Sequence, residues 1–246
     1  MNRLKEGISS FTLHLLAMLF MLLDHSWATI VPGNQWMTCV GRMAFPIFAF
    51  MIAEGFHYTR NVEKYMLRML LFAIISEIPF NLMYGGSMFY PLHQNVMWTF
   101  LMALACMVVI EHMKKEKLWL AIIIDVIVCF WAFIISSISI LDYFGYGVLM
   151  VLVFYFFRGK KWYHYLGQFL GLFFINWFGL AGQVHPVEVL GHTFYIEHQG
   201  LALLALPIIW LYQGKQGPYN RVIKYSFYAF YPVHLLILGL LVYGLM

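Results

Sequence analysis

Charged side chains are scarce in this chain. Asp, Glu, Lys and Arg together make up 11% of its 246 residues, whereas hydrophobic residues make up 63%. Soluble domains carry about 25% charged residues, and no soluble core of this size could bury so much apolar surface. The scarcity of charge therefore excludes an ordinary soluble protein and predicts an all-α, polytopic integral membrane protein.

Cysteine and the common cofactor motifs are also missing or rare. The three cysteines, Cys39, Cys106 and Cys129, include no CxxC pair and form no disulfide framework. The sequence has no P-loop, no Rossmann glycine pattern and no GxSxG nucleophile elbow. The phosphate loop of soluble acetyltransferases (Q/R-x-x-G-x-G/A) is absent too. Any coenzyme site must therefore be built in another way.

Metal-ligand motifs are equally weak. Segment 182–198 contains three histidines and two glutamates, but their spacing matches no standard zinc site such as HExxH. We therefore expect no metal. The five residues are His185, Glu188, His192, Glu197 and His198.

Long apolar runs are what the sequence has in abundance. A helix crosses a bilayer with about 20 apolar residues. The runs predict about nine spans, with eight or ten as alternatives because the fifth and sixth adjoin. We expect one transmembrane domain over residues 1–246 and no soluble domain. The spans are 9–31, 38–58, 64–83, 94–112, 118–138, 141–157, 163–181, 199–213 and 224–246.

The basic residues predict the orientation of these spans. Of the 15 Lys and Arg residues, 14 lie at the N-terminus or at the end of an even-numbered span, and Arg42 is the exception. The loops on the opposite side, at 32–37, 84–93, 139–140 and 182–198, contain no Lys or Arg. By the positive-inside rule the N-terminus is cytoplasmic and the C-terminus lies outside. This placement accounts for the net charge of +4 without a nucleic-acid partner.

Two adjacent titratable residues, Asp24 and His25, lie inside the first apolar run. A charge at mid-membrane costs about 2.5–3.5 kcal/mol on insertion scales, so such groups are kept mainly where they line an aqueous or substrate cavity. Counting from the outer turn places His25 and Arg42 at a similar depth on neighbouring spans. Asp24 or His25 can therefore meet Arg42. Pro46 frees the carbonyl of Arg42, so the second span should bend there.

Two interpretations of this group stay open. In the functional one, a base, an orienting carboxylate and a cation share one site. In the structural one, Asp24 and Arg42 form an ion pair that only neutralises two charges. The adjacent histidine favours the functional interpretation because an ion pair does not need it.

A second polar group is predicted at the first inner turn. Glu54 and Arg68 lie at equal distances in sequence before and after this turn, so they share a depth and could pair. Arg60, Lys64 and Arg68 lie on one helical stripe if the helix continues through Arg60. Such a stripe suits a polyphosphate like that of coenzyme A. Plain positive-inside flanking with snorkelling side chains produces the same pattern.

Other polar residues lie within or at the edge of apolar spans. For His234, near the middle of the last span, a structural and a functional role are equally open. Asp125 could simply lie near a helix–helix contact. The remaining buried polar candidates are Glu77, Asn95 and Thr99.

An ordered series of motifs runs through the first part of the chain. It comprises Leu22-Leu23-Asp24-His25, Gly41–Phe50, Glu54–Arg60, Arg68 and Ser76–Phe80. The series resembles the TraX family, most strongly over residues 20–100, and beyond that through Asn95 to Thr99 and Tyr231 to His234. This family is distantly similar to the acyltransferase-3 proteins and to the lysosomal heparan-alpha-glucosaminide N-acetyltransferase.

The resemblance implies an acyl-coenzyme A-dependent transmembrane acetyltransferase in a bacterial cell membrane. The namesake of the family acetylates the amino terminus of conjugative pilin. The distant relatives carry an acyl group from cytoplasmic acyl-coenzyme A across the membrane, using a histidine of an early helix. By this resemblance His25 is the general base and Asp24 orients and tunes it. Arg42 would stabilise the thioester oxyanion or position the acceptor.

The same resemblance implies acetyl-coenzyme A as the acyl donor, held at the cytoplasmic mouth. Arg60, Lys64 and Arg68 would bind its phosphates, with Glu54 and Tyr58 in the same cofactor site. The acceptor stays open between a peptide amine, a sugar hydroxyl and a lipid head group. N- or O-acetylation, an acetyl-histidine intermediate and homo-oligomerisation are open as well.

Two other classes of function compete with the enzyme. A proton-coupled secondary transporter or permease is one, since buried Asp, Glu and His also mark proton relays. Many such transporters contain two related halves, which this sequence does not show. A structural or assembly protein, with ion pairs only for helix packing, is the other.

Overall fold

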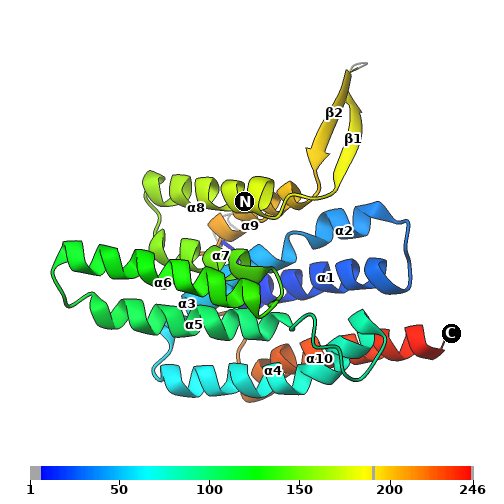
Figure 1. Cartoon of the computed structure of the whole chain (residues 1–246), viewed down its shortest axis with the longest axis horizontal. Coiled ribbons are helices and arrows are strands. Elements are labelled where there is room, and N and C mark those ends of the chain that lie inside the picture. The colour runs from blue at the N-terminus through cyan, green and yellow to red at the C-terminus, as the bar shows by residue number, and fades with distance from the viewer. Residues whose placement is uncertain (1–6, 190–191, 245–246) are drawn as a thin grey trace. The chain divides into compact units, whose positions relative to one another are not determined.

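The computed structural model describes residues 7–189 and 192–244 (Figure 1). Contacts within the chain divide it into two compact units. Unit 1 takes in the chain up to Phe48 together with Gly159–Phe227, and unit 2 takes in Ala49–Arg158 and the chain from Tyr228. Two of the boundaries fall inside helices α3 and α10. The expectation of a single domain over residues 1–246 stays a prediction.

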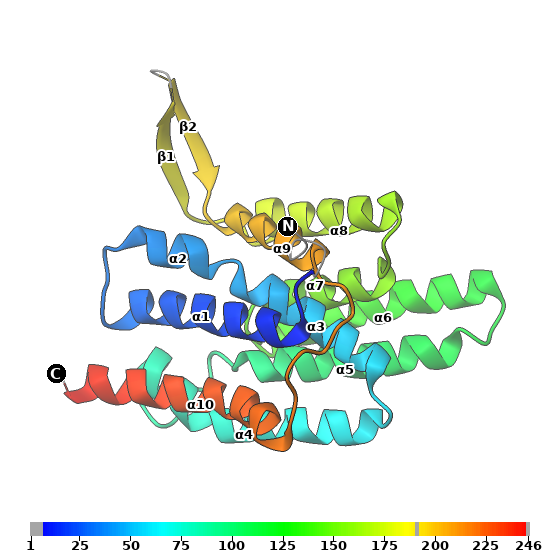
Figure 2. The same cartoon turned by 180° about the vertical axis from the view of Figure 1, so that it is seen from behind.

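Unit 1 contains two groups of packed elements. Helix α1 packs along α2, and α8 packs against η2, η3 and α9. Figures 1 and 2 both show the two strands extending away from α8 and α9. The elements are α1 (Ser10–Thr29), α2 (Gln35–Gly41), the first residues of α3 (Ala44–Tyr58), α8 (Trp162–Phe174), the π-helical η2 (Ile175–Gly179), β1 (Val184–Val189), β2 (His192–Glu197), the 3-10 helix η3 (Gln199–Leu204), α9 (Ala205–Trp210) and the start of α10 (Arg221–Gly244).

Unit 2 is organised around α5. This helix packs against α4, α6 and α7, and its residues Ala103, Leu104, Met107 and Ile110 are fully buried. The elements are the remainder of α3, α4 (Val62–Gly85), α5 (Val96–Met113), α6 (Leu118–Ile138), α7 (Phe144–Phe156) and α10 from Tyr228.

The helices confirm the predicted fold class. Among the described residues, six helices are long and apolar enough to cross a membrane. The three other predicted spans fall on shorter helical segments, namely α7, α8 with η2, and η3 with α9. The predicted orientation of the termini stays a prediction. Counting α2 and α3 as one stretch, the six are Ser10–Thr29, Gln35–Tyr58, Val62–Gly85, Val96–Met113, Leu118–Ile138 and Arg221–Val242.

Helix α6 shows the surface expected of a lipid-facing segment. Its buried residues are Ala132 and Ser136, whereas Ile123, Val126 and Phe130 are exposed. An exposed apolar face of this extent is rare on a soluble monomer, but it is normal against lipid tails. The chain is a multi-pass membrane protein.

The second predicted span is broken at Arg42. Helix α2 ends at Gly41 and α3 begins at Ala44. Because Pro46 has no N–H, the carbonyl of Arg42 lacks its usual helical donor four residues later. The helix is therefore interrupted at the arginine where the sequence predicted a bend.

Segment 182–198 was expected to be a plain loop, but it contains a β-hairpin. β1 and β2 pair antiparallel, with Val184 opposite Glu197 and Val189 opposite His192. Glu197 also ties the base of this hairpin, since its Oε1 accepts from the N–H of Gly182 at 2.7 Å. The two strands are rich in β-branched and aromatic residues, which favour strands: Val184, Val187 and Val189 in β1, and Thr193, Phe194, Tyr195 and Ile196 in β2.

Candidate functional site

Helices α1 and α2 approach closely at Gly41. A Cβ added at this glycine would lie 2.4 Å from Asp24 Cβ and 2.7 Å from Asp24 Oδ1. No side chain larger than hydrogen fits there without moving the aspartate. The glycine therefore allows α2 to present its polar side chains to Asp24.

We expect Gly41→Ala to disturb this contact strongly. The added methyl group forces α1 and α2 apart, which should lower the stability of the protein by about 1–3 kcal/mol, as overpacking usually does. The measurement is thermal unfolding in detergent. Gly182→Ala is the control, since a Cβ there has no neighbour within 4 Å. Equal melting temperatures for the two variants would contradict the close approach.

Arg42 and Asp24 form an ion pair at this approach. Arg42 Nη2 donates to Asp24 Oδ1 at 2.5 Å and to Oδ2 at 2.6 Å. Thr38, one turn before Arg42, donates its hydroxyl to Asp24 Oδ1 at 2.6 Å. The two charged side chains are only 21% and 16% exposed. The contact predicted from equal depth on neighbouring spans is therefore present.

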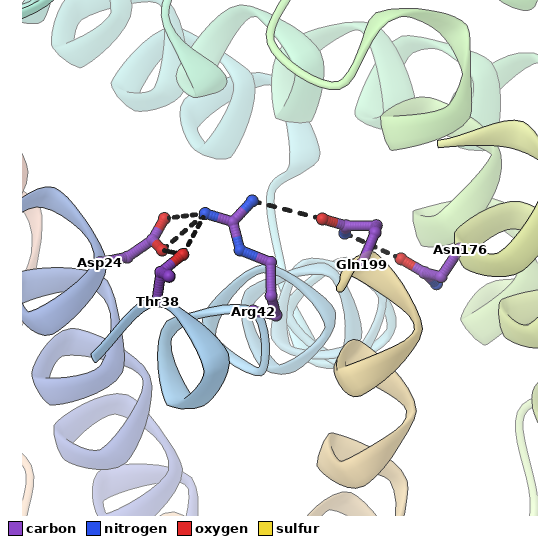
Figure 3. A network of polar contacts seen from close by, with 5 residues as sticks. All are labelled: Asp24, Thr38, Arg42, Asn176 and Gln199. Carbon is purple, nitrogen blue, oxygen red and sulfur yellow. Dashed lines mark hydrogen bonds and ion pairs between the residues drawn. The ribbon is translucent and has the colours of Figure 1, made fainter. Parts of the chain in front are cut away.

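The polar contacts continue on the other side of Arg42 (Figure 3). Arg42 Nη1 donates to Gln199 Oε1 at 3.3 Å, and Gln199 Nε2 donates to Asn176 Oδ1 at 3.0 Å. Asn176 Nδ2 donates in turn to the carbonyl of Leu172 at 2.8 Å. The network thus joins α1, α2, η3 and η2 within unit 1.

His25 lies next to Asp24 on α1 and is partly buried. Its backbone carbonyl accepts the hydroxyl proton of Thr29 at 2.6 Å. The Asp24 carboxylate itself binds Arg42 and Thr38. The role of His25 as a base, and that of Asp24 in orienting it, stay predictions.

At the predicted cytoplasmic end of unit 2, Glu54 pairs with Arg158. Arg158 Nε donates to Glu54 Oε1 at 2.5 Å and Nη2 donates to Oε2 at 3.4 Å. Its guanidinium also lies 5.5 Å from the centre of the Tyr58 ring. The pairing of Glu54 with Arg68 suggested by the sequence is wrong, because depth along a helix leaves the direction of a side chain undetermined.

The basic stripe of Arg60, Lys64 and Arg68 is also corrected in part. Helix α3 ends at Tyr58, and Asn61 caps α4 by accepting from the N–H of Lys64 at 2.7 Å. Arg60 therefore lies in the turn between two helices, outside the stripe that Lys64 and Arg68 share on α4. An Asn before a helix is a strong N-cap, which explains the interruption.

Arg68 is partly buried against the ring of Tyr65, whose centre lies 5.7 Å from its guanidinium carbon. Its Nε atom is buried and has no hydrogen-bond partner among the described residues. None of the ion pairs formed by the described part of the chain involves Arg68. Its charge is thus available to an anion.

The negative charge of Glu111, at the end of α5, is balanced by the neighbouring Lys114. Its Oε2 accepts from Lys114 Nζ at 2.7 Å and from the hydroxyl of Tyr155 at 2.5 Å. Burial by itself lowers the pKa of Lys114, but the hydrogen bonds with Glu111 and Tyr155 outweigh it and leave this pKa above its usual value. The lysine stays charged and bound to Glu111.

Glu77 and Asn95 link α4 to the start of α5, and Thr99 links α5 to the segment that precedes α7. Asn95 Nδ2 donates to Glu77 Oε2 at 2.5 Å, and Trp98 Nε1 donates to the same oxygen at 3.0 Å. Thr99 donates its hydroxyl to the carbonyl of Asp142 at 2.7 Å. Asn95 and Thr99 are fully buried. Their contacts are those of structural residues, although they leave Glu77 without a cationic partner among the described ion pairs.

His234 is buried in α10, and its Nδ1 lies 2.7 Å from the carbonyl of Phe230, on whose ring it stacks. This arrangement favours the structural interpretation. In the described part of the chain, no three His, Cys, Asp or Glu residues are grouped to hold a metal ion. The side chains of His185 and Glu188 lie outside the described part, and the absence of a metal stays a prediction.

Sequence reasoning missed several partners of the candidate residues. Arg158 looked like ordinary cytoplasmic flanking. Asn176 and Gln199 gave a usable signal, since each is an amide within or at the edge of an apolar span. Pairing them with Arg42 would have required knowing that distant segments meet.

The fold and the network around Arg42 define a multi-pass helical membrane protein with an ion pair held between its first helices. The chain belongs to the TraX family, whose model, described as "TraX protein", matches residues 9–242. It is similar to the "Probable fimbrial assembly protein FimC, serogroup H1" of Dichelobacter nodosus, with 27% identity over 249 aligned positions that cover 94% of each chain. No solved structure matches the chain significantly. The resemblance drawn from the motifs is confirmed.

Proposed function

We propose that this protein is a membrane acetyltransferase. It moves an acetyl group from cytoplasmic acetyl-coenzyme A to an amine or hydroxyl of an extracytoplasmic acceptor. The observation that supports this most is the Asp24–Arg42 ion pair beside His25 in a chain that belongs to the TraX family. A pair that only neutralised buried charge would not need an adjacent imidazole.

The chemical step is a direct acyl transfer. The acceptor nitrogen or oxygen attacks the thioester carbonyl carbon, the carbon–sulfur bond breaks, and the coenzyme A thiolate leaves. His25 takes the proton that the acceptor loses and passes it to the thiolate. Arg42 supplies the positive charge that stabilises the oxyanion. Asp24 and Thr38 both accept from Arg42 Nη2 and so hold one side of the guanidinium.

The cofactor phosphates bind at the cytoplasmic end of unit 2, on Lys64 and Arg68 of α4 and on Arg60 in the preceding turn. The charge balance there supports this assignment. Glu54 is bound to Arg158, and Glu111 to Lys114, whereas Arg68 has no carboxylate partner among the described residues. A planar guanidinium suits bidentate binding of phosphate. Glu54 and Tyr58 contribute by fixing Arg158.

Arg68→Ala should weaken the binding of coenzyme A by a factor of about 10–100, since a hydrogen bond to a charged group contributes about 1.5–3 kcal/mol. Isothermal titration with coenzyme A measures the effect. Lys115→Ala is the matched control, because it removes one exposed positive charge of unit 2, in the turn after α5, and is not assigned to the site. Equal loss of affinity in both variants would show that only net charge matters and would remove the assignment.

The function itself is tested with purified protein and radiolabelled acetyl-coenzyme A. Candidate acceptors are a peptide with a free amino terminus, an amino sugar and an aminophospholipid. Because the family's namesake acts on pilin and the relative from Dichelobacter nodosus carries a fimbrial assembly name, the peptides should include the amino terminus of a fimbrial subunit. Transfer of label by the wild type and not by His25→Ala supports the enzyme. No transfer to any acceptor class speaks against it.

A proton-coupled transporter is the second candidate. The observation that favours it is Glu77, a carboxylate within a membrane-spanning helix that accepts hydrogen bonds from the neutral Asn95 and Trp98. Substrate flux into liposomes that is driven by a pH gradient, needs no coenzyme A and is lost in Glu77→Gln would identify a transporter.

A further inference from the structure

Two buried amide side chains, Asn176 and Gln199, are linked to Arg42 by hydrogen bonds (Figure 3). Asn176 is fully buried and Gln199 is 8% exposed. In sequence they are far from Arg42, and Gln199 follows it by 157 positions. Neither amide is needed to neutralise a charge, because Asp24 already does so. Their presence beside the ion pair calls for another explanation.

The direction of each amide is fixed by its neighbours. The carbonyl of Leu172 can only accept, so Asn176 must turn its Nδ2 toward it. Asn176 Oδ1 then faces Gln199, which must present Nε2. Gln199 Oε1 is thereby aimed at Arg42, which can only donate. The hydrogen bonds therefore all run in one direction: Arg42 donates to Gln199, Gln199 donates to Asn176, and Asn176 donates to the backbone of α8.

The backbone of unit 1 is shaped to place this chain. Asn176 lies in η2, a π-helical segment that follows α8 directly. Such wide turns are rare and occur frequently at functional sites. Gly200 next to Gln199 lets η3 approach η2, since a Cβ there would lie 2.7 Å from the ring of Trp177. The wide turn and the glycine bring the two amides into contact.

We propose that Asn176 and Gln199 are positioning residues that set the direction of the Arg42 guanidinium and give its Nη1 atom a neutral acceptor. Asp24 binds one Nη atom and the neutral Gln199 binds the other. A glutamate in place of Gln199 would neutralise the guanidinium a second time and remove the positive charge that an oxyanion needs. The positioning follows from the contacts, whereas its effect on acetyl transfer rests on the proposed function.

The positioning is tested by the chemical accessibility of Arg42. The protein is treated with phenylglyoxal, and modification at Arg42 is followed by peptide mass spectrometry. Asn176→Leu and Gln199→Leu should each react severalfold faster at Arg42 than the wild type, because the guanidinium loses its support. Gln168→Leu is the matched control. Gln168 is also a buried amide of unit 1, and it accepts from Trp210 Nε1 at 2.8 Å. Its loss should leave the reaction at Arg42 unchanged.

A second variant separates charge from geometry. Gln199→Glu loses the donor to Asn176 but places a carboxylate against Arg42, and this second ion pair should keep modification at Arg42 no faster than in the wild type. In the transfer assay its kcat should fall while KM for acetyl-coenzyme A is unchanged. If Gln199 had only a structural role, the variant would lower the melting temperature without a selective fall in kcat at unchanged KM.

The outcomes distinguish the positioning role of the two amides from the proposed acetyltransferase function. Wild-type modification rates in either leucine variant, or equal acceleration in Gln168→Leu, overturn the positioning role whatever the activity. Faster modification in both leucine variants together with no acetyl transfer by the wild type keeps the positioning role and overturns the proposed function. Full activity of Gln199→Glu overturns the claim that Arg42 needs a neutral second partner.

Discussion

Replacement of His25 by alanine will lower the rate of acetyl transfer by a factor of about 10²–10⁴, the usual contribution of a general base. Without the imidazole, the proton of the acceptor has no side chain to receive it in the transition state. In the proposed site coenzyme A binds other residues, so kcat should fall while KM for acetyl-coenzyme A stays the same. Steady-state kinetics with labelled acetyl-coenzyme A measures both constants.

His14→Ala is the control for this variant. His14 lies on the same helix, with its Nδ1 2.8 Å from the carbonyl of Ser10, and it stacks on Phe227. Its loss should leave kcat unchanged. A wild-type rate in His25→Ala would remove the base from the mechanism. Equal losses in both histidine variants would indicate general damage to α1.

Replacement of Asp24 by alanine will destabilise the protein by about 3–5 kcal/mol, because it leaves a buried cation without its counter-ion. The Arg42 side chain is only 21% exposed, so water cannot replace the carboxylate fully. Thr38 also loses its acceptor. The measurement is unfolding of the purified protein in mixed micelles with increasing SDS.

The double variant Asp24→Asn with Arg42→Gln isolates the cause. If the unpaired charge is what destabilises, the double variant should be more stable than Asp24→Asn alone, since both charges are gone. A double variant that loses the sum of the two single effects would indicate that the residues act independently and that the ion pair contributes nothing.

The long helices and the first polar contact could be predicted from the sequence. Apolar runs fix the helical spans, because a backbone in lipid must satisfy its hydrogen bonds internally. The meeting of Asp24 with Arg42 followed from two features alone, a short connection and equal depth. Pro46 fixed the break at Arg42 by removing one helical donor.

The remaining contacts depend on how distant segments meet, which depth and periodicity do not encode. Glu54 pairs with Arg158 across 104 residues of sequence, and Gln199 reaches Arg42 across a still longer separation. The end of α3 before Arg60 could have been predicted, since Asn61 is a good N-cap. The regular spacing of the basic residues instead suggested a helix that continues through Arg60.

The most direct test of the account uses sealed proteoliposomes with radiolabelled acetyl-coenzyme A inside and the acceptor only outside. Wild-type protein should place labelled acetyl groups on the external acceptor while acetyl-coenzyme A stays inside, and His25→Ala should not. The account would be contradicted if the external acceptor stayed unlabelled with the wild type, or if both proteins labelled it equally.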